Sequence, residues 1–165
     1  MPKVTRKPGP GDERLRVAIQ DLHGVVGKVG WFQSSHYPDG TPVAYVASIQ
    51  EHGYPAGGIP PRLGMRDTAD KQRAIWADVA RRGAKAVLKG TTTAREAMEQ
   101  LGLKAAGDMR KHIAEVVSPP LKAATIQDRL RQRANRKVMG ALDKPLVFSG
   151  ELIDSLTNTT ERTGT

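Results

Sequence analysis

The chain of 165 residues contains no cysteine, so disulfide bonds, thiolate metal sites and cysteine nucleophiles are all excluded. Aromatic residues make up only 4% of the sequence, which leaves no visible platform for stacking nucleic-acid bases. No apolar run approaches the roughly 20 residues of a membrane span, and the N-terminus lacks the apolar core of a signal peptide. We therefore expect a protein that needs no membrane and stays in the compartment where it is made.

Positive charge is what the sequence has in excess. Lysine and arginine number 26 against 17 acidic residues, for a net charge of +9. Such a surface favours polyanions, above all nucleic acid, although an acidic protein partner or simple solubility are alternatives. The basic residues cluster between Lys122 and Lys137, where the six candidates for contact with DNA are opposed by Asp128 alone: Lys122, Arg129, Arg131, Arg133, Arg136 and Lys137.

The length fits one domain, which we place at residues 12–156. Residues 1–11 combine prolines and glycines with basic residues and are expected to form a flexible arm. The polar residues 157–165 are expected to form a loose tail.

Two apolar runs, 25–32 and 41–53, are predicted to be the strands of an antiparallel hairpin, because the second alternates in its apolar character. Between the two runs, residues 37–40 read YPDG, a typical turn. Helical periodicity predicts the remaining elements, several α-helices that pack on this small sheet: 12–22, 67–89, 93–102, 103–116, 121–138 and a short helix after Ser149. Thr93 and Glu96 form a capping box, and Gly102 is expected to end that helix. The fold class is therefore α+β.

Catalytic motifs find no support in the sequence. The four histidines show no metal-ligand spacing, and Glu51–His52 is the only neighbouring pair of an acid and an imidazole. On a strand their side chains would point to opposite faces, so we expect a structural or surface role for His52. No nucleophile elbow or phosphate-binding loop is present. We predict that the protein is not an enzyme and that it uses neither a metal nor a cofactor.

The segment EHGYPAGGIPPRLGMR, residues 51–66, is a stiff elbow. Pro60 and Pro61 lack N–H groups and restrict the backbone, so the segment cannot pair fully in a sheet. One interpretation is a simple link from the strand to a helix. The other is a preformed loop that docks on a neighbour, with Ile59 as its apolar anchor and Arg62 as a charged clamp.

The order of these motifs resembles the tail-completion or neck proteins of long-tailed bacteriophages, of which minor tail protein Z is one type. The matching residues near the start are Val29–Phe32, Tyr37, Asp39–Thr41, Val43, Ala44, Glu51, Gly53 and Ile59–Arg62. Near the end, KPLVFSGELIDSLT is similar to the family's closing motif through Lys144, Pro145, Leu146, Ser149, Gly150, Leu152 and Ser155. The chain departs from the family at Leu63, Gly64 and Met65, where proline and phenylalanine are usual, and in its short polar end, where the family often adds a strand.

The resemblance implies a structural virion protein that completes the tail and joins it to the head, late in assembly in the host cytoplasm. Such proteins form homo-oligomeric rings, commonly hexameric, around the DNA channel, in contact with adjacent neck and tail proteins. Candidates for the interface are Glu51, Gly53, Ile59, Pro60, Pro61 and Arg62, and the basic helix would contact DNA without reading its sequence. A different neck component (tail terminator or adaptor) and a stand-alone basic nucleic-acid-binding module remain as alternatives.

Overall fold

The computed structural model describes residues 9–62, 64–133, 141–147 and 149–163. Most of the arm expected at residues 1–11 lies outside this range, and so do the last two residues. The fold class is α+β, as predicted: within these ranges the chain forms six α-helices and a two-stranded antiparallel sheet that packs against α4. No helix in the described ranges is long and apolar enough to cross a membrane.

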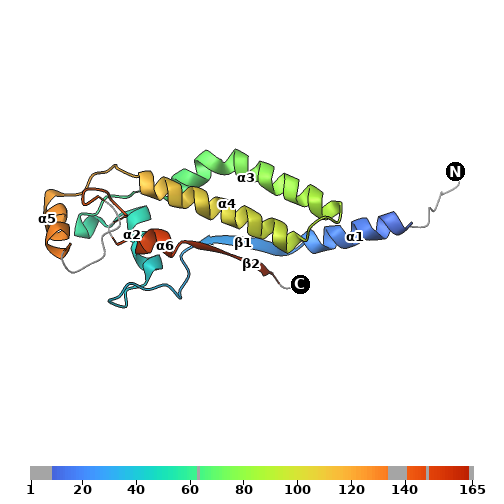
Figure 1. Cartoon of the computed structure of the whole chain (residues 1–165), viewed down its shortest axis with the longest axis horizontal. Helices are drawn as coiled ribbons and strands as arrows, with labels where there is room; N and C mark the ends of the chain where they lie inside the picture. The colour runs from blue at the N-terminus through green and yellow to red at the C-terminus, as the bar shows by residue number, and fades with distance from the viewer. Residues whose placement is uncertain (1–8, 63, 134–140, 148, 164–165) are drawn as a thin grey trace.

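The body of the molecule is a pair of long helices with a ribbon of two strands beneath it (Figure 1). Helix α3, Met65–Leu88, packs against α4, Ala94–Glu115, and the strands β1, Val25–Gly30, and β2, Thr157–Arg162, both pack against α4. Strand register runs from Val25 opposite Arg162 to Gly30 opposite Thr157.

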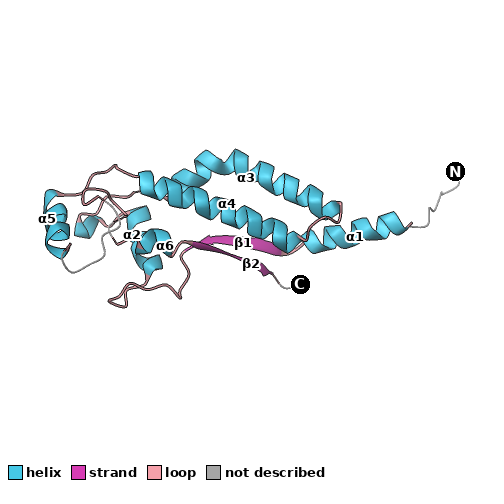
Figure 2. Cartoon of the chain, viewed as in Figure 1, coloured by secondary structure: helices cyan, strands magenta, loops and turns pink. Residues whose placement is uncertain are grey.

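The two ends of this body differ (Figure 2). Helix α1, Pro10–Leu22, projects from one end. At the other end lie α2, Val43–His52; the short helix η1, Pro55–Gly57; α5, Ala123–Gln132; and α6, Glu151–Asp154. The core sits at this second end and joins residues from α2, from α4 and from α6 and the turn after it: Val43, Ala47, Met109, Ile113, Leu152 and Leu156.

The predicted hairpin is wrong in its second strand. Residues 41–53 contain helix α2, whose residues Val43, Ala47 and Glu51 repeat every four positions and are all buried. The spacing of the apolar residues fits the period of a strand as well as that of an α-helix. Packing of Val43 and Ala47 on the core favours the helix. Hydrogen bonding between Tyr37 and Gly40 does close the expected turn, but that turn leads into a helix.

Strand β1 pairs instead with the segment that we expected to be a loose tail. Residues Thr157–Arg162 form β2, whose inward positions Asn158 and Thr160 are partly or fully buried. Threonine is β-branched and suits a strand, and one face of this ribbon can remain polar because only the other face meets α4. In this segment β-propensity and pairing with β1 outweigh the polarity of the side chains.

The prediction that Gly102 ends a helix is wrong. Gly102 lies buried inside α4, which continues to Glu115. A Cβ atom at Gly102 would lie 2.8 Å from the side-chain nitrogen of Asn158 on β2. Glycine therefore allows the close approach of α4 to the sheet. At the start of α4, by contrast, the capping box between Thr93 and Glu96 is present as predicted.

Candidate functional site

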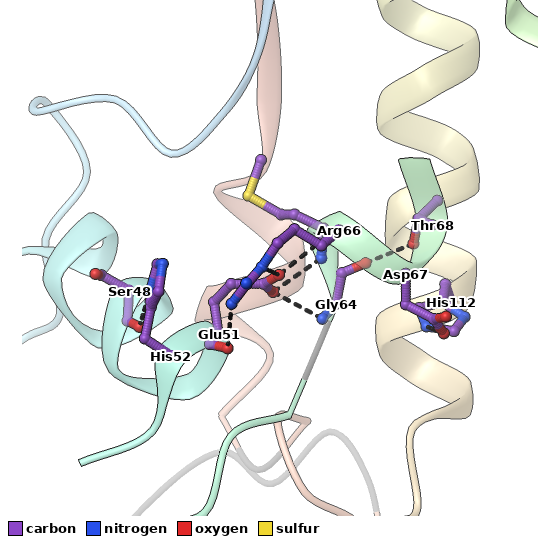
Figure 3. A network of polar contacts seen from close by, with 9 residues as sticks. Ser48, Glu51, His52, Gly64, Arg66, Asp67, Thr68 and His112 are labelled. Atoms are coloured by element: carbon purple, nitrogen blue, oxygen red, sulfur yellow. Dashed lines mark hydrogen bonds and ion pairs between the residues drawn. The ribbon is translucent and has the colours of Figure 1, made fainter. Parts of the chain in front are cut away.

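Glu51, at the end of α2, caps the first turn of α3 (Figure 3). Its carboxylate accepts hydrogen bonds from the backbone N–H groups of Gly64, at 2.8 Å, and of Met65 and Arg66, both at 3.0 Å. Arg66 adds a side-chain contact from Nε at 3.2 Å. These N–H groups have no partner within the helix, so a residue from another element fulfils the role of an N-cap.

The electrostatics of this cap favour the ionised carboxylate. Glu51 is only 8% exposed, and burial by itself opposes ionisation. Hydrogen bonds from the N–H groups of Met65, Arg66 and Gly64 outweigh burial and lower the pKa of Glu51 below its usual value. The positive end of the α3 dipole acts in the same direction. Glu51 is thus a structural anion that ties α2 to α3 across the elbow.

The histidines near this cap do not join Glu51 in a common site. His52 turns away on the surface of α2, where its Nδ1 lies 3.0 Å from the carbonyl oxygen of Ser48 (Figure 3). His112 lies on α4, with Nε2 2.8 Å from Oδ2 of Asp67 on α3. The carboxylate of Glu51 points to the start of α3 instead.

The elbow itself is a compact turn. Tyr54 and Ile59 exchange two backbone hydrogen bonds around η1, and the backbone N–H of Arg62 donates to the carbonyl oxygen of Gln50 at 2.6 Å. Gly53 has a φ of 79°, and a Cβ there would lie 2.9 Å from the backbone nitrogen of Pro61. Only glycine fits this position without strain.

Arg62 faces inward, and its guanidinium binds backbone and amide oxygens of its own chain. Nε donates to the carbonyl of Pro119 at 3.0 Å, Nη2 to that of Pro120 at 3.2 Å, and Nη1 to the side-chain oxygen of Gln50 at 3.2 Å. The residue is 6% exposed, and this burial lowers its pKa. Arg62 therefore holds the Pro119–Pro120 linker against the elbow.

Other elbow residues reach the surface. Pro61 is exposed, while Ile59 and Pro60 are partly buried. Of the six interface candidates, Glu51, Gly53 and Arg62 thus make contacts inside the chain, and Ile59, Pro60 and Pro61 remain accessible to a partner. An interface role for this segment stays a prediction.

A groove of about 970 Å³ opens beside the elbow. One wall is the elbow from Pro55 to Arg62, another is the linker and start of α5 from Pro120 to Arg129, and a third belongs to the closing motif at Leu146, Ser149 and Leu152. Segments that are far apart in the sequence therefore converge at one end of the molecule.

The closing motif is fixed from several sides. Trp31, just after β1, donates from Nε1 to the carbonyl of Leu152 at 2.7 Å. Lys144 donates to the carbonyl of Ala114 at 3.2 Å, and its own carbonyl accepts from Arg129 at 2.6 Å. Trp31, from the motif that follows β1, is thus in direct contact with Leu152 of the closing motif.

The basic cluster is split by the structure. Lys122, Arg131 and Arg133 are exposed, while Arg129 is partly buried and donates to the carbonyls of Leu142 and Lys144. Arg136 and Lys137 lie outside the described residues. Burial, together with the nearby charge of Arg62, lowers the pKa of Arg129.

The described part of the chain contains no group of three or more histidine, aspartate or glutamate residues that could hold a metal ion. No family model, curated protein or solved structure matches the chain.

Sequence reasoning missed the long-range helix caps. Glu51 was proposed as an interface residue, yet its carboxylate caps α3; likewise Asp21 of α1 accepts from the backbone N–H of Ala94 at 2.8 Å and caps α4. A local capping box has a sequence signature, whereas a cap from a distant element has none. For Asp21 and Glu51, acidic residues near the ends of helices, only the tertiary structure supplies the partner.

Proposed function

We propose that this chain is a structural subunit of the neck of a long-tailed phage. Copies of it assemble into a ring around the DNA channel, complete the tail and join it to the head, together with adjacent neck and tail proteins. It acts by binding other chains and not by catalysis. The resemblance in the order of its motifs suggests this role, and the surface of the molecule supports a role in assembly.

The observation that carries the proposal is the uncovered apolar face of α1. None of the 13 residues of this helix is buried, although its sequence is amphipathic. On this face Leu15 and Ile19, one helical turn apart, remain 46% and 47% exposed, respectively. An amphipathic helix is stabilised mainly by burying its apolar face, and the described part of the chain leaves this face about half exposed. A neighbouring subunit would supply that cover.

The position of α1 also suits a ring. It projects from the end of the body opposite the elbow and its groove (Figure 1). Two different surfaces at opposite ends permit a heterologous contact, in which one end of each subunit meets another surface of the next, and such contacts close into rings when the rotation allows. The accessible elbow residues Ile59, Pro60 and Pro61 are candidates for the second surface.

Contact with DNA is proposed for the exposed part of the basic cluster. The side chain of Arg131 is 81% exposed and makes a long contact of 3.5 Å with Asp128 on the same helix. Arg133 is also exposed. Mobile surface cations of this kind bind phosphates without sequence preference. The same feature favours the alternative function, a stand-alone nucleic-acid-binding module.

Light scattering and electron microscopy of the purified protein, with and without duplex DNA, test the proposal. We expect closed rings, either alone or after addition of the adjoining neck and tail proteins, and incorporation into particles. A protein that remains a monomer under all these conditions and binds short duplexes would favour the stand-alone module. Rings that occupy a different layer of the head–tail junction would point to the terminator or adaptor role.

A further inference from the structure

We propose that the groove beside the elbow binds an extended acidic segment of a partner protein, with a glutamate or aspartate side chain directed toward Arg62, Lys122 and Arg129. The partner would be an adjoining neck protein, and this identification rests on the proposed function. The geometry of the groove depends only on this chain.

The charge of the groove is the first argument. Of the described residues that line it, Arg62, Lys122 and Arg129 are cationic, and one, Asp39, is acidic. Burial and, to a smaller extent, the charge of Arg62 lower the pKa of Arg129, so the two guanidinium groups lie near each other. Lys122 extends its amine over the elbow, since a Cβ on Gly58 would lie 2.5 Å from its Nζ. Cations from two separate elements therefore gather around one groove, and an anion placed there would relieve their repulsion.

Arg62 supplies the second argument. It is 6% exposed, and within the described residues its side chain makes three hydrogen bonds, all to neutral oxygens: those of Gln50, Pro119 and Pro120. Burial of a charge is costly unless an opposite charge compensates it. A guanidinium has about five N–H donors, so three hydrogen bonds leave donors for a ligand. A carboxylate in the groove would give this buried cation a counter-charge.

The lining of the groove favours a peptide over DNA. Beside the cations it presents mainly apolar residues, which include Val46, Ile59, Leu121, Leu146 and Leu152. Such walls accept the side chains of a peptide, whereas phosphates of a duplex meet exposed cations such as Arg131 and Arg133. A recessed arginine among apolar residues fits a ligand that carries both an acid and apolar groups.

Proline determines how a peptide would be held. Pro55, Pro60, Pro61 and Pro120 all line the groove and lack backbone N–H groups. These prolines interrupt any ladder of backbone hydrogen bonds along this surface, so the peptide would be fixed mainly by its side chains. The N-terminal arm of a second copy is excluded as the ligand, because Lys3, Arg6 and Lys7 would be repelled.

The test is binding of a short fluorescein-labelled peptide of glutamate and leucine residues, with an amidated C-terminus, measured by fluorescence anisotropy on the full chain. A peptide with glutamine for glutamate, a glutamine peptide with a free C-terminal carboxylate, and a DNA duplex are the comparison probes. We expect the acidic peptide to bind at least about tenfold more tightly than either glutamine peptide. Equal binding of the amidated glutamine peptide would overturn the proposal. Preferential binding of the free C-terminus would also overturn it, since a terminal carboxylate would then be the ligand.

Variants locate the site. Lys122→Glu, at the exposed rim, is expected to weaken binding of the acidic peptide by about tenfold without disturbing the fold. Arg131→Glu makes the same charge change on α5, which follows Lys122, but outside the groove, and is expected to alter the affinity by less than about twofold. Equal effects of the two variants, or no effect of Lys122→Glu, would contradict the assignment. Arg62 is unsuitable as the main test because its loss would also release the Pro119–Pro120 linker.

The peptide-binding experiment tests the groove independently of the proposed neck function. Peptide binding is measured on the purified chain, whether or not it forms rings. Peptide binding without rings would count against the neck proposal alone, and rings without peptide binding would count against the groove alone.

Discussion

The carboxylate of Glu51 lies 2.8 Å from the backbone nitrogen of Gly64, thirteen residues further along the chain. This contact closes the elbow into a loop whose ends are held by a helix cap. It determines how α2 leaves the core and where α3 begins, and both helices border the end of the molecule that carries the groove. The elbow is therefore rigid for two reasons, its prolines and the buried anion at its base.

Replacing Glu51 by alanine should lower the free energy of unfolding by about 2–3 kcal/mol. The variant leaves the first N–H groups of α3 without their acceptor in a buried place. Urea denaturation followed by circular dichroism measures the change. Glu99→Ala is the matched control, because Glu99 makes only an exposed ion pair with Arg95 and its loss should cost less than about 0.5 kcal/mol. Equal losses for the two variants would contradict the role of Glu51.

The contribution of Glu51 should depend on pH. Its folded-state pKa lies below its value in the unfolded chain, so the unfolded chain takes up a proton first as the pH falls. The stabilisation is complete above the ordinary glutamate pKa of about 4.3 and is lost as the pH falls further, through the folded-state pKa. We expect the difference in unfolding free energy between the wild type and Glu51→Gln to shrink from pH 7 to pH 3. A difference that stays constant would show that the ionised form has no special role.

Gly102 and Gly107 should respond in opposite ways to alanine, although both lie in α4. At Gly102 the added methyl would meet Asn158, and we expect a loss of about 1 kcal/mol even after the gain in helix propensity. At Gly107 a Cβ meets nothing within 4 Å, so the same change should stabilise the protein by about 1 kcal/mol. Thermal unfolding measures both. Two changes of the same sign would refute the close approach of α4 to β2.

The apolar face of α1 should be required for assembly and dispensable for folding. The double variant Leu15→Glu, Ile19→Glu changes exposed side chains on this face, so the circular dichroism spectrum and melting temperature should remain close to those of the wild type. Light scattering should show loss of the oligomer, because two buried charges cannot be tolerated in an apolar contact. Gln20→Glu, an exposed change on the same helix, should assemble normally. Normal assembly of the double variant would exclude this face from the interface.

Exposed arginines of α5 should determine affinity for DNA. Binding of a duplex should weaken steeply with salt, and the double variant Arg131→Glu, Arg133→Glu should reduce both the affinity and the salt slope. Arg73→Glu with Arg81→Glu makes the same charge change on α3 and should have a smaller effect. Similar losses in both double variants would indicate a general effect of net charge. The groove should bind the acidic peptide unchanged in the α5 variant.

Local signals in the sequence predicted much of the helical structure. The capping box at Thr93 and Glu96 and the helical period of residues 67–89 are properties of neighbouring residues, and the structure contains both the capping box and the helix. The strand at 25–32 is also confirmed in its main part, as β1. The candidate site was predicted only as separate pieces: the elbow, the basic cluster and the closing motif.

Residues 41–53 and the C-terminal segment show why the rest was missed. Residues 41–53 fit the period of a strand and that of a helix. Their secondary structure is therefore decided by the surface on which they pack, and for Val43 and Ala47 that surface is the core. A polar threonine-rich end becomes a strand because β1 and α4 offer it hydrogen bonds and one covered face. Neither surface can be seen in the local sequence.

The sequence by itself determined the chemistry that this protein can draw on: no thiols, few aromatics, an excess of positive charge and a proline-stiffened turn. Tertiary structure alone decided that Arg62 is buried in the chain, that Glu51 caps a helix thirteen residues away, and that three distant segments enclose one groove. The physical reason is that side-chain type and the spacing of apolar residues are properties of the local sequence. The burial of a side chain and the partners of a charged group depend on contacts between segments that meet only in the fold.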